Sequence, residues 1–222
     1  RENWYCGSFE AALVPIFRNF TGSTGFVGAQ ADVNRNYSDF DYNETGPQSG
    51  LKGNGINRYI ETGISPYQTG ELSLNDARLM IYSMSEGFET GRLGCRFDGV
   101  GFYMYPRYTT ARAHLCINST SETPVSIPSA AGYIMAQRIN VQLNNFYLRD
   151  NLINTVQNYS ANYKPNTGIA IGAFNNGGSM SHFMTMRLGG YSIGLSFSPA
   201  QYRIHYDAVT RLMNRLGRTL QP

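Results

Sequence analysis

Charged residues are scarce in this sequence. Of its 222 residues, 15% are charged, compared with about 25% in an average globular protein. So low a share fits neither a disordered tail nor the charged outer faces of a helical bundle. The net charge is only +3, and the arginines and lysines are scattered rather than gathered in a stripe. We therefore do not expect the protein to bind nucleic acid.

Cysteines and long apolar runs are scarce as well. The three cysteines, Cys6, Cys95 and Cys116, form no C-x-x-C pair, so neither a zinc site nor a redox pair is predicted. They could form one disulfide at most, and we favour free buried thiols. No apolar run reaches about 18 residues, so we expect no membrane insertion. The chain starts at Arg1 rather than at methionine, from which we expect processing or a longer parent chain.

Aromatic residues and glycine, in contrast, are abundant. The chain has 16 tyrosines, 12 phenylalanines and 24 glycines, a composition typical of many short strands joined by tight turns. A chain of this length can form one large all-β domain that buries roughly 70% of the surface exposed by its unfolded form. The sequence has no internal repeat and no linker, so we predict a single domain over residues 1–222. Within it, residues 1–38 have no assigned structure.

Local patterns predict where the strands lie. Alternating apolar residues predict strands at 79–84, 99–105 and 111–117, a buried strand at 168–174 and a last strand at 188–197. The clearest hairpin joins residues 145–148 to residues 152–155, because Arg149-Asp150-Asn151 between them is prone to form a turn.

The C-terminal segment predicts one helix, at about residues 199–216. Ser198 is a candidate N-cap, Pro199 suits the first helical position, and Gln201 completes a capping box. Apolar residues recur at helical spacing. We expect the buried face of the helix to consist of Ile204, Val209, Leu212 and Leu216. The predicted fold class is therefore all-β with one amphipathic C-terminal helix.

Several segments match one known pattern when they are taken in order. They are Tyr42-Asn-Glu-Thr-Gly46, Gly50-Leu-Lys-Gly-Asn-Gly-Ile-Asn-Arg-Tyr-Ile-Glu-Thr-Gly63, Ile169-Ala-Ile-Gly-Ala-Phe-Asn175, Gly190-Tyr-Ser-Ile-Gly-Leu-Ser-Phe-Ser198 and the helix end Leu216-Gly-Arg218. Together they resemble the concanavalin A-like, LamG-type domains of tailed-bacteriophage virion proteins and bacterial surface proteins. The resemblance covers residues 39–220 and depends mainly on the glycine-spaced starts of strands and on the end of the helix.

This resemblance implies a two-sheet antiparallel jelly-roll sandwich. It also implies a non-catalytic structural or recognition module displayed on a larger assembly, above all a phage virion, as a decoration, fibre or tail component. The expected location is the virion or an extracellular surface. The expected partners are other subunits of that assembly, further copies of the chain in a homo-oligomer, and cell-surface glycans. The resemblance carries over no catalytic residue, because the matching positions are glycines and core residues.

The same fold also hosts polysaccharide-degrading enzymes, so a glycoside hydrolase or lyase is the alternative function. Hydrolysis needs two carboxylates beside the scissile bond. The nearest acidic pattern is Asp39 and Asp41, on one face of an extended segment; it could be a catalytic pair, but solvated acids of a turn are the better interpretation. The other signature would be a cluster of histidine, tyrosine and arginine, but His114, His182 and His205 are scattered along the chain. We therefore expect no enzymatic activity.

The strongest candidate for a ligand site is the segment 102–108. Phe102 and Met104 make the better core pair, so Tyr103 and Tyr105 are predicted to point outward from the same strand. Tyrosine rings beside an arginine suit sugar recognition, which uses a flat apolar face with a polar rim; a plain surface is the alternative. The candidate glycan-binding residues are Tyr103, Tyr105, Arg107 and Tyr108, with Asn175 and Asn176 of a glycine-rich loop as a second set.

A further alternation places oxygen ligands at Asp39, Asp41 and Asn43. Oxygen atoms at alternate positions suit a hard cation, so a calcium site is one interpretation. An EF-hand is excluded, because its sixth position is Glu44 rather than glycine. A solvated turn is the other interpretation, and no other cofactor is predicted.

Overall fold

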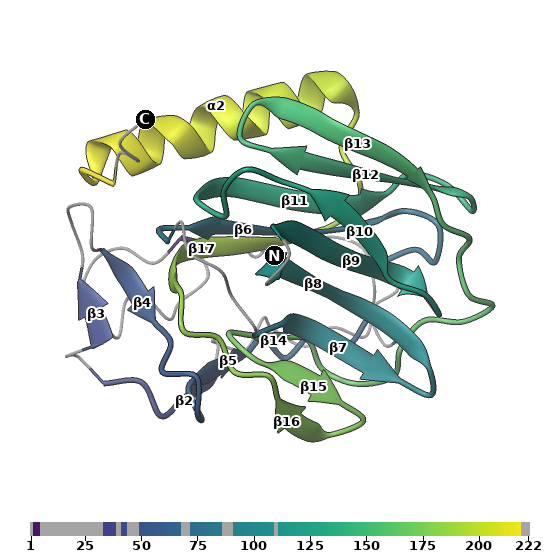
Figure 1. Ribbon diagram of the computed structural model, residues 1–222, viewed down its shortest axis with the longest axis horizontal. Helices are drawn as coiled ribbons and strands as arrows, with labels where there is room; N and C mark the ends of the chain where they lie inside the picture. The colour runs from purple at the N-terminus through teal and green to yellow at the C-terminus, as the bar shows by residue number, and fades with distance from the viewer. Residues whose placement is uncertain are drawn as a thin grey trace, which may run out of the picture.

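The part of the protein that the structure describes is a sandwich of two β-sheets with one long helix on one side (Figure 1). The computed structural model describes residues 2–4, 33–38, 41–43, 49–67, 72–85, 91–108 and 111–218. All strand pairs in these segments are antiparallel except the pair β15–β7, defined below. The predicted all-β jelly-roll sandwich with one C-terminal helix is confirmed.

The first sheet, called sheet A, has the strand order β13-β12-β11-β6-β17-β4-β3, and β1 also pairs with β17. Its strands are β1 (Glu2–Trp4), β3 (Tyr42–Asn43), β4 (Gly50–Lys52), β6 (Ala77–Ser83), β11 (Gly132–Arg138), β12 (Leu143–Leu148), β13 (Asn151–Gln157) and β17 (Arg187–Gly194). The predicted hairpin is confirmed, because β12 and β13 pair across a turn at Arg149 and Asp150.

The second sheet, called sheet B, has the order β10-β9-β8-β7-β14-β5-β2. Its strands are β2 (Val33–Arg35), β5 (Tyr59–Glu61), β7 (Leu93–Phe97), β8 (Val100–Tyr108), β9 (Arg112–Ser119), β10 (Thr123–Ser126), β14 (Ala170–Ile171), β15 (Phe174–Asn176) and β16 (Ser179–Ser181). The sheet forks at β7, which pairs with β14 and also with the β15–β16 hairpin.

The expected single strand at 168–174 is wrong, and its break creates this fork. The segment forms β14, then reverses, and continues as β15. Gly172 lies at the reversal with a φ of +86°, a backbone conformation that glycine adopts without strain and that does not continue a strand. As a result, Ala170 and Phe174 both pair with Gly94 of β7.

The main core lies between the sheets and follows the period of two. Phe102 and Met104 of β8 are buried there, with Leu115 and Ile117 of the neighbouring strand β9. Each fully buried side chain of this size stabilises the fold by about 1.5–3 kcal/mol. The sequence therefore predicted correctly which side chains of β8 face the core.

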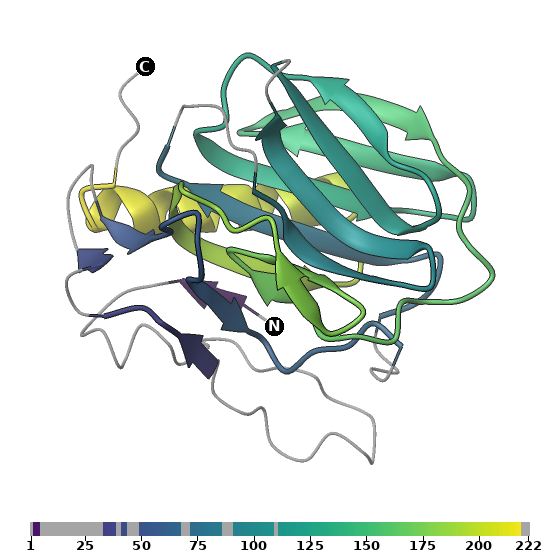
Figure 2. The same cartoon turned by 60° about the horizontal axis from the view of Figure 1, so that its bottom comes forward.

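The helix α2 (Pro199–Arg215) covers the outer face of sheet A. Its N-cap is Ser198, and the capping box with Gln201 is present as predicted. Both views place this helix and the β15–β16 hairpin on opposite sides of the molecule (Figures 1 and 2). The outer face of sheet B is therefore not covered by α2.

The predicted buried face of the helix needs a correction. Tyr202, Val209 and Met213 are the buried residues, whereas Ile204 is 69% exposed. The packed face centres on Tyr202 because its ring stacks on Tyr147 of sheet A, with 4.0 Å between the ring centroids. A residue two positions further along an α-helix points about 200° away, so Ile204 faces solvent. Leu212 and Leu216 are only half-buried.

Two of the three thiols behave as expected. Cys95 and Cys116 are buried and are not part of a disulfide, while Cys6 lies outside the described residues. None of the helices in the described segments is long and apolar enough to cross a membrane.

Candidate functional site

Tyr103 and Tyr105 of β8 lie on the outer face of sheet B, opposite to Phe102 and Met104. Both side chains point away from the core between the sheets, as predicted. The prediction that they are exposed to solvent is wrong. Tyr103 is 2% exposed and Tyr105 is 5% exposed. The rings are buried because they form a second, small aromatic cluster on this face with Phe174.

Two glycines make room for the ring of Tyr103. A Cβ atom at Gly101 would lie 2.2 Å from Cε1 of Tyr103, and one at Gly94 would lie 2.5 Å from its Cα. Gly94 is the register partner of Tyr103 on one side and of Phe174 on the other. The two rings therefore meet across a position without a side chain, with their centroids 5.0 Å apart and nearly perpendicular.

Arg92 lies over these rings. Its guanidinium carbon is 4.1 Å from the ring centroid of Tyr105, 4.7 Å from that of Phe174 and 5.1 Å from that of Tyr103. These are cation–π distances, and such contacts strengthen when they are withdrawn from water. The backbone N–H of Arg92 donates a hydrogen bond of 2.9 Å to the carbonyl of His182, which ties the start of β7 to the end of the β15–β16 hairpin.

Glu122, just before β10, supplies the negative charge of the site. Its carboxylate accepts a hydrogen bond of 2.8 Å from the phenol of Tyr103. The ring Nδ1 of His114 lies 3.1 Å from its other oxygen. A terminal nitrogen of Arg92 is 3.5 Å from the first oxygen. Glu122 thereby joins β8, β9 and the segment before β7.

These contacts shift the ionisation of the cluster. Burial by itself would raise the pKa of Glu122, but hydrogen bonds from Tyr103 and His114 and the charge of Arg92 outweigh it, so its pKa is lowered. Burial raises the pKa of Tyr103 and of Tyr105, against the opposing charge of Arg92. Burial and Arg92 lower the pKa of His182. At neutral pH the site therefore holds an ionised carboxylate, neutral phenols and a neutral His182.

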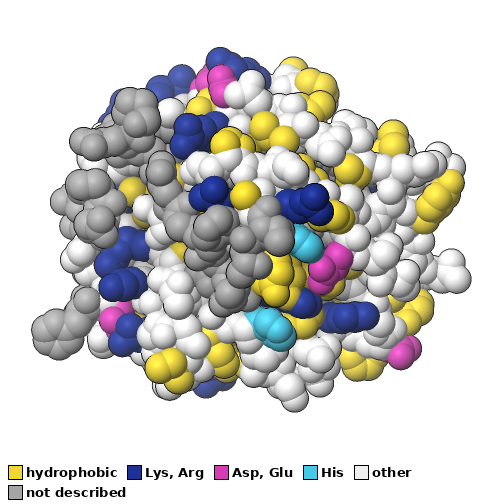
Figure 3. All heavy atoms as spheres, in the orientation of Figure 1, with side chains coloured by type: hydrophobic (Ala, Val, Ile, Leu, Met, Phe, Trp, Pro, Cys, Tyr) yellow, Lys and Arg dark blue, Asp and Glu magenta, His cyan; other side chains and the backbone are white. Residues whose placement is uncertain are grey.

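We call this group of side chains the Arg92 cluster. Its members are Arg92, Tyr103, Tyr105, Tyr108, His114, Glu122, Phe174 and His182. Tyr108 and His114 complete it at one side, with ring centroids 5.5 Å apart. In the space-filling view, histidine, acidic and basic side chains gather around apolar ones near the middle of this face (Figure 3).

Two nitrogen atoms of the cluster are buried without a hydrogen-bond partner among the described residues. They are Nε of Arg92 and Nε2 of His114. The Nδ1 atom of His114 already faces the carboxylate of Glu122, so in the neutral ring its Nε2 atom is the acceptor. The cluster thus contains one donor and one acceptor that are buried and have no hydrogen-bond partner in the described part of the chain.

The second candidate, the loop of Asn175 and Asn176, borders a different feature. The side-chain amide of Asn175 donates to the carbonyl of Gly168 at 2.9 Å, and its oxygen accepts from the backbone of Gly178 at 2.8 Å. Asn175 is therefore buried and holds the hairpin in shape, while Asn176 is exposed.

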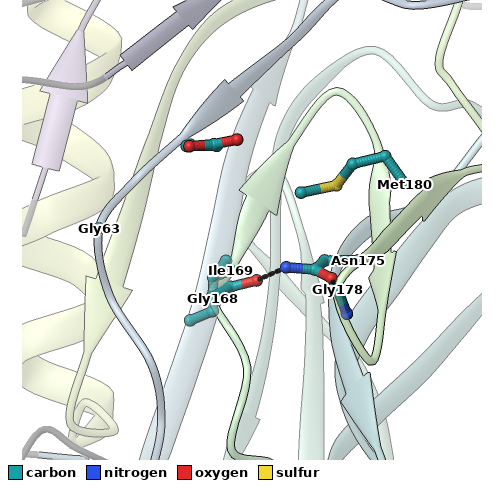
Figure 4. Close-up of a pocket in the computed structure, with 7 residues that line it drawn as sticks. Gly63, Gly168, Ile169, Asn175, Gly178 and Met180 are labelled. Carbon is teal, nitrogen blue, oxygen red and sulfur yellow. Dashed lines mark hydrogen bonds between the residues drawn. The ribbon is translucent and has the colours of Figure 1, made fainter.

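A hollow of about 280 Å³ lies beside this loop, in the fork of sheet B (Figure 4). We call it the Glu61 hollow. It is lined by Glu61, Gly63, Gly168, Ile169, Asn175, Gly178 and Met180. Gly63 lies on one side of it and the thioether of Met180 on the other (Figure 4).

Arg107 and the proposed calcium ligands lie outside both features. Arg107 is half-buried within a bulge of β8, between Tyr105 and Tyr108. The guanidinium over the tyrosine rings belongs to Arg92 instead. The carboxylate of Asp41 forms an ion pair of 2.6 Å with Arg58 and accepts hydrogen bonds from Ser38. Asn43 is exposed, and Asp39 lies outside the described residues. A calcium ion would have to compete with Arg58 for Asp41, so the calcium site stays a prediction.

Sequence reasoning found the tyrosines of the cluster but missed Arg92, Glu122 and Phe174. The sequence placed His114 on an alternating strand, but it did not predict which residues would surround it. Because Glu122 precedes β10 and Phe174 follows the chain reversal at Gly172, no local pattern connects them with β8. The pairing of β7 with β8 and β15 brings Phe174 to this face, and the pairing of β9 with β8 and β10 brings Glu122 there.

No protein-family model matches this sequence, and no curated protein matches it. Some solved structures are similar in fold. The CBM40 domain of the Ruminococcus gnavus IT-sialidase, bound to α2,3-sialyllactose, has 12% identity and a TM-score of 0.46, over 70% of this chain and 96% of that chain. The leech intramolecular trans-sialidase has 10% identity and a TM-score of 0.43, over 86% and 28% of the respective chains. Domain 4 of AbnA, a GH43 extracellular arabinanase from Geobacillus stearothermophilus, in complex with arabinotriose, has 10% identity and a TM-score of 0.41, over 70% and 82%. These likenesses are too distant to assign a ligand to this chain.

Proposed function

We propose that the protein is a non-catalytic glycan-recognition module whose binding site is the Arg92 cluster. The observation that carries this proposal is the position of the Arg92 guanidinium over three aromatic rings, 4.1 to 5.1 Å from their centroids, with Glu122 at 3.5 Å. Sugar sites combine an apolar surface with a few fixed polar groups that select hydroxyl positions.

The exposed parts of the cluster are those that a sugar would contact. Tyr103 and Tyr105 are buried, and their rings pack against Arg92. His182 is exposed and Tyr108 is half-buried. The buried rings fix Arg92 in position, so little side-chain entropy is lost when a ligand binds.

We further propose that this module is displayed on a larger assembly, in particular a phage virion, with other subunits and further copies of the chain as its partners. Weak single sites on one particle gain strength through multivalency, by about 10²–10⁴ in apparent affinity. Locating the chain in its native particle by electron microscopy tests this part. An interior position, or a free monomer as the native form, would overturn it.

Glycan arrays test the binding function directly. We expect the multivalent wild-type protein to bind at least one glycan class and the Arg92→Ala protein to lose that binding. Ile204→Ala, on the exposed face of α2, is the matched control and should bind as the wild type does. If the wild-type protein binds no glycan, or if Arg92→Ala binds equally well, the Arg92 cluster is not a glycan site.

One observation favours a second function, that of a polysaccharide lyase. The structure gathers histidine, tyrosine and arginine on one sheet face, where Nε2 of His114 could accept a proton. Binding is the better proposal because that nitrogen is buried, so a substrate would first have to uncover it. A rise in absorbance of unsaturated products from uronate polysaccharides, abolished in His114→Gln, would establish the lyase instead.

A further inference from the structure

We propose that the Arg92 cluster and the Glu61 hollow are two parts of one elongated site, which binds a neutral oligosaccharide rather than a single or an acidic sugar. This inference rests on the proposed glycan-binding function and specifies its ligand. Three features of sheet B carry it: the shared face, the hairpin between the two parts, and the pairing of charges.

The register of sheet B places the two parts on the same face. Tyr103 pairs with Gly94, Gly94 pairs with Ala170, and Ala170 pairs with Glu61. Directly paired residues on neighbouring strands point to the same side of a sheet. Glu61 therefore lies on the outer face that carries the ring of Tyr103, while its neighbour Ile60 faces the core.

The β15–β16 hairpin contacts both parts. Phe174 and His182, at its two ends, belong to the Arg92 cluster. Asn175, Gly178 and Met180, within it, line the Glu61 hollow. Since the same short hairpin forms a wall of each part, a ligand chain that crosses it reaches from one to the other.

The separation of the two parts requires a chain. From β8 to β5 there are three strand-to-strand steps, or about 14 Å at the usual spacing. One sugar ring cannot span that distance, but an oligosaccharide can. The hollow offers what a second sugar ring needs. Met180 provides apolar surface and Glu61 an oxygen acceptor, and a Cβ atom placed at Gly178 would meet nothing within 4 Å.

The charges in both parts are already paired. Arg92 faces Glu122 at 3.5 Å. Arg35 binds Glu61 through two hydrogen bonds of 3.0 and 3.1 Å, which is the strong bidentate geometry. An acidic sugar would have to displace one of these carboxylates from its arginine, whereas hydroxyl groups can bond to both partners without breaking the pair. The ligand class that fits is therefore neutral.

Calorimetric titration with a ladder of probes tests the proposal. The neutral probes are gluco-, manno- and arabino-oligosaccharides from monosaccharide to hexasaccharide. The acidic probes are 3′-sialyllactose and oligogalacturonates. In the best neutral series, we expect the Kd to fall by about tenfold or more between the shortest and the longest members, and the acidic probes to bind more weakly.

Two variants of Met180 test whether the gain in affinity with oligosaccharide length depends on the Glu61 hollow. Met180→Trp should fill the hollow and Met180→Ala should remove one of its walls, so each should abolish the gain with length while the shortest bound member keeps its affinity. Thermal melting confirms that the variants fold, and Ile204→Ala serves as the control. Arg92→Ala should weaken every member of the series.

The outcomes separate this inference from the function on which it rests. If binding depends on Arg92 but not on chain length, or if both Met180 variants keep the gain with length, the elongated site is wrong and the binding function stands. If acidic probes bind more tightly than neutral ones of equal length, the neutral class is wrong. If no probe binds the wild-type protein, both proposals fail.

Discussion

Tyr103 donates a hydrogen bond of 2.8 Å to the carboxylate of Glu122, and this contact links the buried aromatic layer of sheet B to the charged rim of the Arg92 cluster. Tyr103 packs closely against Gly94 and Gly101, which have no side chains. Glu122 in turn contacts Arg92 and His114. The orientation of one phenol thus helps to determine where the charges of the site lie.

The first prediction concerns this hydrogen bond and pH. A carboxylate whose pKa is lower in the folded than in the unfolded state stabilises the fold above its ordinary pKa of 4.5, and this contribution is lost as the pH falls through the folded value. We expect the melting temperature of the wild type to exceed that of Glu122→Gln at about pH 7, and the difference to shrink below about pH 4.5. A difference that grows on acidification would contradict the lowered pKa of Glu122.

The variant Tyr103→Phe tests the same hydrogen bond by removing its donor. Removing the hydroxyl should raise the pKa of Glu122, because the carboxylate loses its shortest hydrogen bond. The cost in stability should be about 1 kcal/mol, since Glu122 remains partly solvated. Carboxyl titration by NMR measures the first effect and urea unfolding the second. An unchanged pKa would mean that the bond does not form in solution.

The second prediction compares two glycines. Gly94 has a φ of +121°, and an added Cβ would lie 2.2 Å from the carbonyl oxygen of Phe102. Gly94→Ala should therefore lower the free energy of unfolding by about 3 kcal/mol or more. Gly99 has a φ of +85° but open space around it, so Gly99→Ala should cost only about 1 kcal/mol. Chemical denaturation measures the free energy of unfolding of both variants. If the two variants lose equal stability, Tyr103 can move far enough to accommodate a methyl group at position 94.

The third prediction concerns the helix. In α2, Met213 is fully buried and Ile204 is exposed. Met213→Ala should destabilise the protein by about 2–5 kcal/mol, whereas Ile204→Ala should change its stability by no more than about 0.5 kcal/mol. Leu212→Ala should fall between them, because Leu212 is half-buried. A large loss for Ile204→Ala would mean that the helix packs through the face first expected.

The fourth prediction concerns Arg138, a fully buried side chain of β11. It donates to the backbone carbonyls of Ile117 at 2.7 Å and of Asn158 at 2.8 Å, and burial lowers its pKa to about 10. Arg138→Met removes these donors and leaves buried carbonyls without partners, at a cost of about 3 kcal/mol. If Arg138→Met melts at the wild-type temperature, water replaces the guanidinium at these carbonyls.

Several features of this protein are local, and the sequence alone determined them. The alternation in β8 placed Phe102 and Met104 in the core, the turn residues placed the β12–β13 hairpin, and Ser198 and Gln201 placed the start of α2. Each depends on residues a few positions apart, where strand period, turn preference and capping act directly.

Only the tertiary structure decided which neighbours those residues meet. Tyr103 and Tyr105 were expected on a solvated surface, but Phe174 and Arg92 cover them, because β7 pairs with β8 on one side and β15 on the other. The face of α2 is likewise chosen by the stacking of Tyr202 on Tyr147 rather than by the apolar positions of the helix alone. Such contacts join segments that are far apart in sequence. Their energy depends on which strands become neighbours, and the local pattern of a single strand does not contain that information.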